Sequence, residues 1–543
     1  MKYFFQNVLL AILFTANISF TQNIATTVSN ALRYGTGNEN VGEAGQFEIA
    51  KEYLDNISDV RLFASNFTLG FRLELSNPPE FGIPFRGLRK KYIEFQKENF
   101  SVRAGDSYAL FGRGLALHLF ENRTLAFDNS VEGIRATYRR KYFSATILGG
   151  DIHFVEPSTL LIPPLRKENY QLRAATTEIN IIKQISLGAS YTWAQGFLQT
   201  FLPEINDTIV ANIPEVFASL RFPFADAFVS FAEKKTRVGN IDSAVGSALY
   251  FSLSHSGKQY GVTMEYKNYH FDIVHPFNPS FSNVFRPTRM LPFQNPPIVH
   301  KEHSLTLLTR YPHLVNFNDE VGFQLDGFFA VNPNMTLNGN FSMASKHNAY
   351  EINWKNFQLK KLSRGKSWLP SLAKERAPFW EWYFDVDYFF KGEESYVKIG
   401  YDRRSEIVYE IFAFEHEQYQ RITVVPLIVQ YAFDEIWSVK ISSEQQWLNK
   451  FPTKKRYYTQ LISMQLSHSP DFSFGFRYEF TDSPNEPKKK KNWLVFECGY
   501  RIGTNHTLTL AYGSERGGQV CSNGICRTVN PFNGTRFSMT NHF

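Results

Sequence analysis

Stretches in which apolar and polar residues alternate recur along the whole chain, and they restrict its fold more than any other feature. In residues 67–75 one face is entirely apolar and the other is polar or small: Phe67, Leu69, Phe71, Leu73 and Leu75 against Thr68, Gly70, Arg72 and Glu74. Residues 472–480 repeat this arrangement almost residue for residue, and 335–343 and 260–266 follow it too. Because successive strand side chains point to opposite faces, each stretch predicts a β-strand with one apolar face.

The composition of the two faces favours a membrane barrel over other β folds. An apolar face opposite a face of Thr, Gly, Arg and Glu is typical of a strand with lipid outside and water inside. A two-layer sandwich also alternates, but its solvent face seldom holds so much glycine. The 52 Phe and 27 Tyr residues fit strands, because aromatic side chains pack well on a pleated surface. A helical membrane protein is excluded, since no apolar run of helix-spanning length follows residue 22 and mean hydropathy is -0.29.

We therefore predict an all-β fold, a single large transmembrane antiparallel β-barrel over residues 23–543. The pattern indicates roughly 22–26 strands, an even number being usual, and we recognise no separate plug domain. The count of candidate strands is about 25, so at least one strand is missed or invented, most simply near residues 351–359. The predicted strands cover residues 24–34, 60–76, 91–97, 100–106, 131–140, 142–150, 169–180, 185–195, 214–222, 227–236, 247–256, 258–267, 301–311, 319–330, 334–345, 379–390, four between 395 and 447, 457–467, 471–481, 492–501, 505–513 and 533–543.

The two ends of the sequence agree with export to an outer membrane. Residues 1–22 have a lysine at position 2, an apolar centre over 8–14 and a small, polar end, the organisation of a cleaved secretory signal peptide. The last predicted strand places Phe537, Met539 and Phe543 on one face, and we expect these side chains to contribute to barrel closure. Asn541 on the same face weakens the match.

Three stretches do not read as strands and are predicted to form inward or surface loops near residues 107–130, 275–300 and 345–378. The second is rich in proline, which cannot donate to a strand ladder, and the third is long and basic. A barrel of this size has a wide lumen. We therefore expect at least one of the three to fold inward, because the membrane would otherwise leak.

Two of the three cysteines enclose an Asn-Gly turn, and in an exported chain this predicts a Cys521–Cys526 disulfide at a loop tip. Short and long connections alternate near the C-terminus. Counting from a periplasmic C-terminus, this alternation puts the lysine run 488–491 and the loop 514–531 at the cell surface. Cys498 shares a face with apolar residues and is expected to face lipid or to be packed. No metal site is predicted at the cysteines, since no suitably spaced ligands lie nearby.

Residues 102–117 and 121–133 follow patterns of the form G-x-x-Y-x-x-F-G-x-G-L and E-x-R-x-L-x-x-D-N, and residues 517–527 form a cysteine loop before the closing strand. Together these stretches resemble a family of exported outer-membrane barrel proteins of unknown function. The chain departs from the pattern at Ala126 and Asn523, where glycine is expected. The resemblance implies location and architecture but no activity, because the family has none assigned.

Residues 111–133 support a separate hypothesis. Two glycines allow a tight turn or a close backbone approach, and charges of both signs follow within a short span. We predict that this segment enters the lumen as a candidate constriction tied to the wall by Arg–carboxylate pairs; an ordinary structural corner between strands is the alternative. The candidate residues are Phe111, Gly112, Arg113, Gly114, Glu121, Arg123 and Asp128.

The sequence favours a pore, transport or export channel component of the outer membrane, with Arg72, Arg477, Tyr191 and Trp193 as candidate lumen residues. A non-conducting structural or assembly partner of an envelope or secretion machine is the first alternative, and a soluble secreted β-sandwich binding protein the second. We expect no enzyme, because no nucleophile–base arrangement is recognised among the 13 histidines. No cofactor is predicted.

The expected partners are outer-membrane lipid and lipopolysaccharide, the barrel-assembly machinery through the C-terminal strand, and an envelope protein. Nucleic acid is not expected to be a partner, because the 58 basic residues are interleaved with 51 acidic ones.

Overall fold

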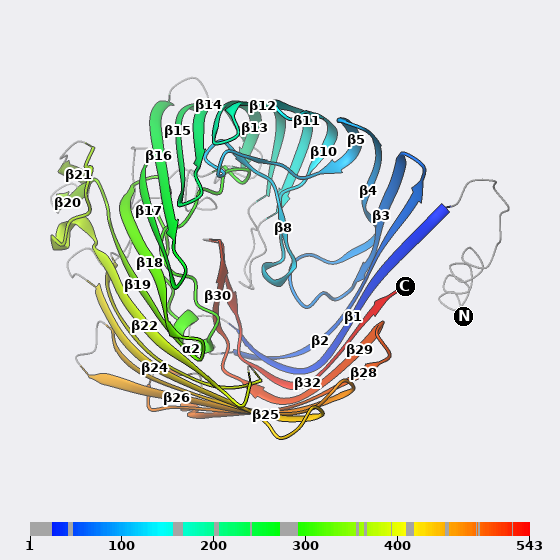
Figure 1. Cartoon of the computed structure of the whole chain (residues 1–543), viewed down its shortest axis with the longest axis vertical. Coiled ribbons are helices and arrows are strands. Elements are labelled where there is room, and N and C mark those ends of the chain that lie inside the picture. The colour runs from blue at the N-terminus through cyan, green and yellow to red at the C-terminus, as the bar shows by residue number, and fades with distance from the viewer. Residues whose placement is uncertain are drawn as a thin grey trace.

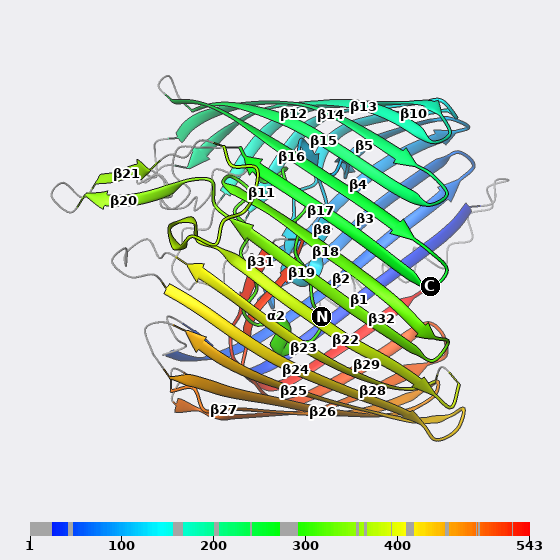
Figure 2. The ribbon, with the colours of Figure 1, turned by 60° about the vertical axis from the view of Figure 1, so that its left-hand side comes forward.

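The computed structural model describes residues 24–41, 47–155, 167–199, 206–238, 242–271, 291–353, 358–362, 366–392, 394–408, 418–450, 455–484, 486, 489–523 and 525–543. Within these residues, 24 strands form one continuous sheet in which every pair is antiparallel. The first strand, β1 (Ile24–Val41), pairs with the last, β32 (Phe532–His542), so that the sheet closes into a barrel (Figures 1 and 2). The fold class predicted from sequence is confirmed.

The barrel strands between β1 and β32 are β2 (Phe47–Ala64), β3 (Phe67–Ser76), β4 (Phe85–Lys97), β5 (Phe100–Ser107), β10 (Val131–Arg139), β11 (Phe143–Val155), β12 (Lys167–Ile182), β13 (Ile185–Gln199), β14 (Asn206–Arg221), β15 (Ala225–Val238), β16 (Asp242–Ser256), β17 (Tyr260–His270), β18 (Glu320–Asn332), β19 (Met335–Ser345), β22 (Phe379–Phe390), β23 (Ser395–Val408), β24 (Gln418–Ala432), β25 (Trp437–Lys450), β26 (Arg456–His468), β27 (Phe472–Thr481), β28 (Asn492–Ile502) and β29 (His506–Glu515). Closure pairs the backbone groups that an open sheet would leave exposed at its edges.

Small elements lie outside this sheet. They are β6 (Leu110–Phe111), β7 (Leu117–His118), β8 (Glu121–Asn122), η2 (Arg123–Leu125), β9 (Phe127–Asp128), α2 (Thr306–Thr309), β20 (Ala349–Asn353), β21 (Gln358–Leu362), η3 (Lys374–Arg376), β30 (Gly518–Ser522) and β31 (Ile525–Val529). No helix in the described ranges is long and apolar enough to cross a membrane.

The alternation in the sequence decides which side of each strand faces outward. In β3 the side chains of Phe67 and Leu69 are 50% and 43% exposed, whereas Arg72 on the opposite face is buried. Around the ring large apolar side chains cover the outside, and the inward side chains are polar except where they pack against segments inside the barrel. The exterior is thus an apolar surface that water would not stabilise.

Connections of different length leave the two ends of the barrel. At one end the turns contain two to four residues, as at 65–66 and 391–394. The longest connections all leave the other end, at residues 108–130, 271–319, 346–378 and 516–531, and the connection 77–84 leaves it too. We call these the short-turn end and the long-loop end.

The observed 24 strands lie within the predicted range, but three assignments were wrong. The stretch 60–76 contains parts of two strands, β2 and β3, and only three strands, not four, lie between 395 and 450. Residues 301–311 form no barrel strand; they lie inside the ring and include α2 (Figure 1). The suspected extra strand near 351–359 is the hairpin β20–β21, which pairs only with itself.

Three segments from the long-loop end fold into the barrel, where Figure 1 shows β8, α2 and β30 inside the ring of strands. We call residues 108–130 the first inner segment, residues 291–319 the second inner segment, and β30–β31 the inner hairpin. Residues 366–372 belong to the third stretch that the sequence does not assign to strands, and they lie on the outside of the barrel wall. The backbone carbonyl of Trp368 accepts a hydrogen bond of 2.7 Å from Tyr266, whose face of β17 points outward.

Several predictions fall outside the described residues. They are the signal peptide over residues 1–22, the first part of the stretch 275–300, and Lys488 of the lysine run.

Candidate functional site

The turn at Gly112–Gly114 is wedged between the barrel wall and the second inner segment. Gly112 has φ +55°, and a Cβ there would lie 2.1 Å from the carboxylate of Glu215 on β14. Gly114 has φ +90°, and its Cβ would lie 2.5 Å from the backbone oxygen of Asn295. Both positions therefore require glycine, for backbone conformation and for space. Between them the guanidinium of Arg113 lies 4.9 Å from the ring centroid of Phe228.

Apolar packing holds most of the first inner segment. Phe111, Leu115, Leu117 and Leu125 are at most 2% exposed and pack against inward residues of β11, β12, β14 and β15. Backbone and side-chain hydrogen bonds then join this segment to the second inner segment. Gln294 donates to the oxygen of Leu115 at 2.8 Å, and Asn129 donates to that of Pro292 at 2.9 Å. The two segments are therefore in direct contact inside the barrel.

Ion pairs connect the far side of the first inner segment to the wall. Arg72 on β3 donates to Asp59 at 2.7 Å and to Glu121 at 2.6 Å, and Lys90 on β4 lies 2.7 Å from Asp128. Arg123 pairs with the same Asp59. The predicted Arg–carboxylate pairs are present, with Arg72 as a partner supplied by the wall.

The pKa of Glu121 shows the strength of this arrangement. Burial acts to raise it, but the hydrogen bond from Arg72 and the charges of Lys90, Arg72 and Arg123 lower the pKa to about 2. Glu121 is therefore ionised at every physiological pH.

The two departures from the family pattern fall on unusual backbone positions. Ala126 has φ +52° and Asn523 has φ +51°, both in the left-handed region that favours glycine. Asn adopts this region readily, whereas Ala does so at a cost. The glycines expected at these positions thus have a conformational reason.

Two polar residues of the barrel wall form hydrogen bonds with the backbone of the second inner segment. Glu444 on β25 accepts the backbone N–H of Leu307 at 2.7 Å and of Thr306 at 3.1 Å, at the start of α2. Gln446, two residues further along the strand, donates to the oxygen of Leu307 at 2.7 Å. The side chains of Leu307 and Leu308 pack against inward residues of β22, β24, β25 and β26.

A buried charge network follows α2. Arg310 donates to Glu479 on β27, and Arg516 donates to the same carboxylate at 2.9 Å and also to Glu486. The side chains of Arg310, Glu479 and Arg516 are all at most 8% exposed. One carboxylate therefore holds the second inner segment and the start of the inner hairpin together.

Histidines of the second inner segment form a further buried cluster that the sequence analysis did not identify. His313 lies 2.8 Å from Glu406 and 3.3 Å from Glu320, and it stacks on Phe379. Burial acts to lower the pKa of His313, but these two carboxylates raise it to about 9. Burial lowers the pKa of neighbouring His300 to about 3, so one imidazole is charged and the other neutral.

One group of side chains could hold a metal ion by ligand type. The ligand atoms of His303, Glu381 and Asp402 lie within 4.8 Å of one another. However, Arg404 approaches both carboxylates, at 3.9 Å for Glu381 and 3.7 Å for Asp402, and supplies positive charge there. The arrangement is that of a buried ion-pair cluster.

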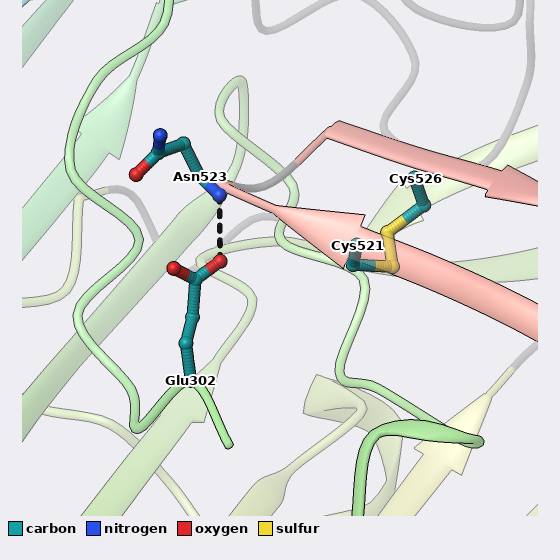
Figure 3. The surroundings of a disulfide bond; sticks show 4 residues. All are labelled: Glu302, Cys521, Asn523 and Cys526. Atoms are coloured by element: carbon teal, nitrogen blue, oxygen red, sulfur yellow. Dashed lines mark hydrogen bonds between the residues drawn. A yellow bond between two sulfur atoms is a disulfide. The ribbon is translucent and has the colours of Figure 1, made fainter. Parts of the chain in front are cut away.

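The disulfide Cys521–Cys526 predicted from sequence is present, but its surroundings differ from the prediction. The loop was expected at the cell surface; instead it bends into the barrel as the inner hairpin. There Asn523 donates its backbone N–H to Glu302 at 2.6 Å (Figure 3) and accepts a hydrogen bond from Asn295 at 2.9 Å. Below it, the guanidinium of Arg527 lies 3.5 Å from the ring centroid of Phe81. These contacts with lumen residues stabilise the inward position of the hairpin.

On the short-turn side of the first inner segment lies a cavity of about 850 Å³, which we call the vestibule. It is lined by inward residues of β4, β5, β10–β12, β14 and β15 and ends at Phe111, Gly112 and Arg113. Its charged lining residues are Glu98, Arg113, Arg135, Arg139, Glu178 and Arg221. Four of these six are arginines, so the vestibule is a positively charged space.

Other candidate residues lie partly as expected. Arg72 and Arg477 face inward, the latter pairing with Glu515 at 2.6 Å. Tyr191 and Trp193 were wrongly placed in the lumen: they lie on the outward face of β13, since Thr192 and Ala194 between and beside them are buried inside. Phe537 and Met539 pair with Tyr34 and Leu32 across the closing seam. Phe543 exchanges backbone hydrogen bonds with Val28.

With this geometry in place, comparison with known sequences assigns a family. Residues 3–543 match a family of unknown function, DUF6029. The chain belongs to this family. The match covers all three stretches on which the resemblance to a barrel family of unknown function rests, and DUF6029 carries no described activity. No curated protein matches the chain.

Solved structures give only distant likenesses. The siderophore receptor PirA from Pseudomonas aeruginosa is 8% identical, with a TM-score of 0.45 over 95% of this chain and 80% of that one. The P pilus usher (PapC) translocation pore is 7% identical, with a TM-score of 0.42 over 95% and 99%. OccK5 (OpdH) from Pseudomonas aeruginosa is 10% identical, with a TM-score of 0.35 over 75% and 97%. Values this low support no shared function, and the barrel assignment rests on strand pairing alone.

Proposed function

We propose that this protein is an outer-membrane channel whose lumen is closed in the present structure by its inner segments. The proposed location follows from the exterior. Exposed apolar side chains ring the barrel, as on β3, β11 and β18, and such a surface requires lipid. A closed antiparallel ring is also one of the two backbone arrangements that satisfy all polar groups in a bilayer.

The observation that carries the transport proposal is the vestibule. An arginine-lined space of about 850 Å³ runs inward from the short-turn end and reaches the Phe111–Arg113 turn. A purely structural barrel needs no such space. We infer that the turn is the constriction and that solutes pass when the first inner segment moves. The excess of arginine favours anionic solutes.

The proposal is tested by conductance in planar bilayers. Replacing residues 112–118 with a Gly-Ser linker of equal length removes the turn and should convert a closed barrel into an open pore. A reversal potential in a KCl gradient should then show anion preference. The matched control replaces residues 366–372, outside the lumen, in the same way and should remain closed.

Heat-dependent mobility on SDS gels first establishes that each variant forms a barrel. An intact barrel that stays closed after removal of the turn would refute the constriction. It would favour the alternative, a non-conducting partner of an envelope or secretion machine. The seam strand β32 is the segment proposed to engage the barrel-assembly machinery.

A further inference from the structure

A cluster of arginines lies on the outside of the barrel, where an apolar surface is expected. Arg403 on β23, Arg421 on β24 and Arg456 on β26 are all exposed. Their outward direction follows from the strand pattern, because Asp402, Arg404, Ile422, Val424 and Tyr457 beside them are buried on the inner face. An arginine facing lipid costs about 2–4 kcal/mol at the bilayer midplane but only about 0–1 kcal/mol near the interface, so a cluster of three is expected at the edge of the apolar band.

Strand register brings the three arginines together. Arg403 lies opposite Thr423, Arg421 opposite Ser405 and Asn449, and Asn449 opposite Arg456. The arginines therefore occupy two adjacent outward rows across β23–β26. Both rows lie near the long-loop end, where β23 and β25 finish and β24 and β26 begin.

Aromatic side chains surround the cluster and form a groove. Trp380, Tyr401 and Trp447 line a groove of about 830 Å³ together with Arg403, Arg421 and Arg456. The guanidinium of Arg456 lies 5.4 Å from the ring centroid of Trp447. Tryptophan and tyrosine concentrate at the level of lipid headgroups, because one end of each ring system is apolar and the other is polar.

Beyond one polar outward pair, Gln445 opposite Gln460, the outward rows become apolar. Toward the short-turn end the exposed residues of the same strands are Ile399, Leu427, Ile441 and Met464. The groove thus lies at the upper border of the apolar band, and its arginines are at headgroup depth.

Within the described ranges no ion pair joins Arg403, Arg421 or Arg456 to a carboxylate, unlike Lys235, which pairs with Glu233 at 3.1 Å elsewhere on the exterior. We propose that this groove is a binding site for the phosphorylated headgroup of a lipid in the outer leaflet, such as the phosphates of lipid A. Guanidinium groups bind phosphate through paired hydrogen bonds, and the tryptophans contact the adjoining acyl chains. This inference rests on the proposed membrane location and not on conduction.

The test measures lipid retention by the full-length protein in nanodiscs. Wild-type protein in phosphatidylcholine nanodiscs containing lipid A should bind lipid A roughly 100-fold more tightly than the triple variant R403Q/R421Q/R456Q, since each basic residue at a charged lipid surface contributes about fivefold. Native mass spectrometry counts the bound lipid. Dephosphorylated lipid A should bind to both proteins equally weakly, and inorganic phosphate alone should not compete.

A matched variant controls for net charge. R140Q/K183Q/R501Q removes the same three positive charges at the short-turn end and should retain lipid A like the wild type. Equal lipid A binding by wild type and R403Q/R421Q/R456Q would overturn the proposal. Heat-dependent gel mobility of both variants shows separately that the barrel forms, so failure of the lipid site is distinguished from failure of the membrane proposal.

Discussion

The two inner segments fill the same lumen but are held in different ways. The first inner segment is packed by apolar side chains, among them Phe111 and Leu117, and its ion pairs lie at a partly exposed edge, where Arg123 is 44% exposed. The second inner segment shares part of this apolar packing, as at Phe293, but is held in addition by polar groups that are themselves buried. Glu444 accepts hydrogen bonds from the start of α2, and Glu479 lies between two arginines.

Because of this difference, the two segments should be destabilised by different kinds of substitution. Apolar packing tolerates changes of charge and pH, but it weakens when volume is removed. A buried ion network tolerates little loss of charge, because removal of one partner leaves the other charge buried and uncompensated. The first segment, which forms the proposed constriction, should therefore respond to packing changes and the second to charge changes.

The largest effect is expected from Glu479→Gln. Two buried guanidinium groups would share a neutral amide, at a cost of about 3–5 kcal/mol in local stability. Hydrogen–deuterium exchange should rise in residues 291–319 and 516–531 and change little in 108–130. The matched control is Glu515→Gln. Glu515 also pairs with two arginines, Arg477 and Arg536, but its side chain is 25% exposed. If Glu515→Gln lowered local stability as much as Glu479→Gln, burial would not explain the effect.

Leu117→Ala tests the opposite segment. Leu117 is fully buried, so the change removes packing and leaves a cavity, at a cost of about 3 kcal/mol. Exchange should increase in residues 108–130. Leu110→Ala, at the 54% exposed neighbour in the same small sheet, should have little effect. If exchange rose equally in 291–319, the two segments would have to be treated as one cooperative unit.

Alkaline pH should loosen the second segment through His313. Its folded pKa of about 9 lies above its usual value of 6.5, so protonation stabilises the folded state. This contribution is fully present below pH 6.5 and is lost as pH rises through 9, by about 2 kcal/mol between pH 7 and 9.5. Exchange of 291–319 corrected for intrinsic rates should show the loss, and His313→Gln should abolish the pH dependence. An unchanged profile in His313→Gln would assign the effect to another group.

The smallest expected effect is an increase in local stability. Ala126→Gly relieves a left-handed residue in the first inner segment and should stabilise it by about 1 kcal/mol. Asn523→Gly in the inner hairpin should change local stability less, because asparagine already tolerates this conformation. Slower exchange around residue 126 with no change around 523 is the expected result; a loss at 126 would contradict the strain argument.

Much of the fold could be predicted from the sequence because its signal is local. Alternation of period two in stretches such as 67–75 and 472–480 depends only on neighbouring residues, and it correctly gave strands and their outward faces. Strand boundaries were less certain, as at 60–76, because a two-residue turn at Ser65 and Asn66 carries no glycine or proline to mark it. The glycine turn at 112–114 and the charges after it were also visible as a local pattern.

Tertiary structure alone decided what fills the barrel. Residues 301–311 read as a strand, yet their polar groups find partners on wall strands more than 130 residues away, such as Glu444, which lies 138 residues from Thr306. The partner of Glu121 was likewise invisible, because Arg72 is 49 residues distant. The cysteine hairpin was predicted to lie outside the barrel for the same reason.

The sequence by itself determined that the chain forms a barrel with an apolar exterior, since that depends on alternation. Which loops enter the lumen was decided by long-range hydrogen bonds and ion pairs, which exist only after closure brings distant strands together.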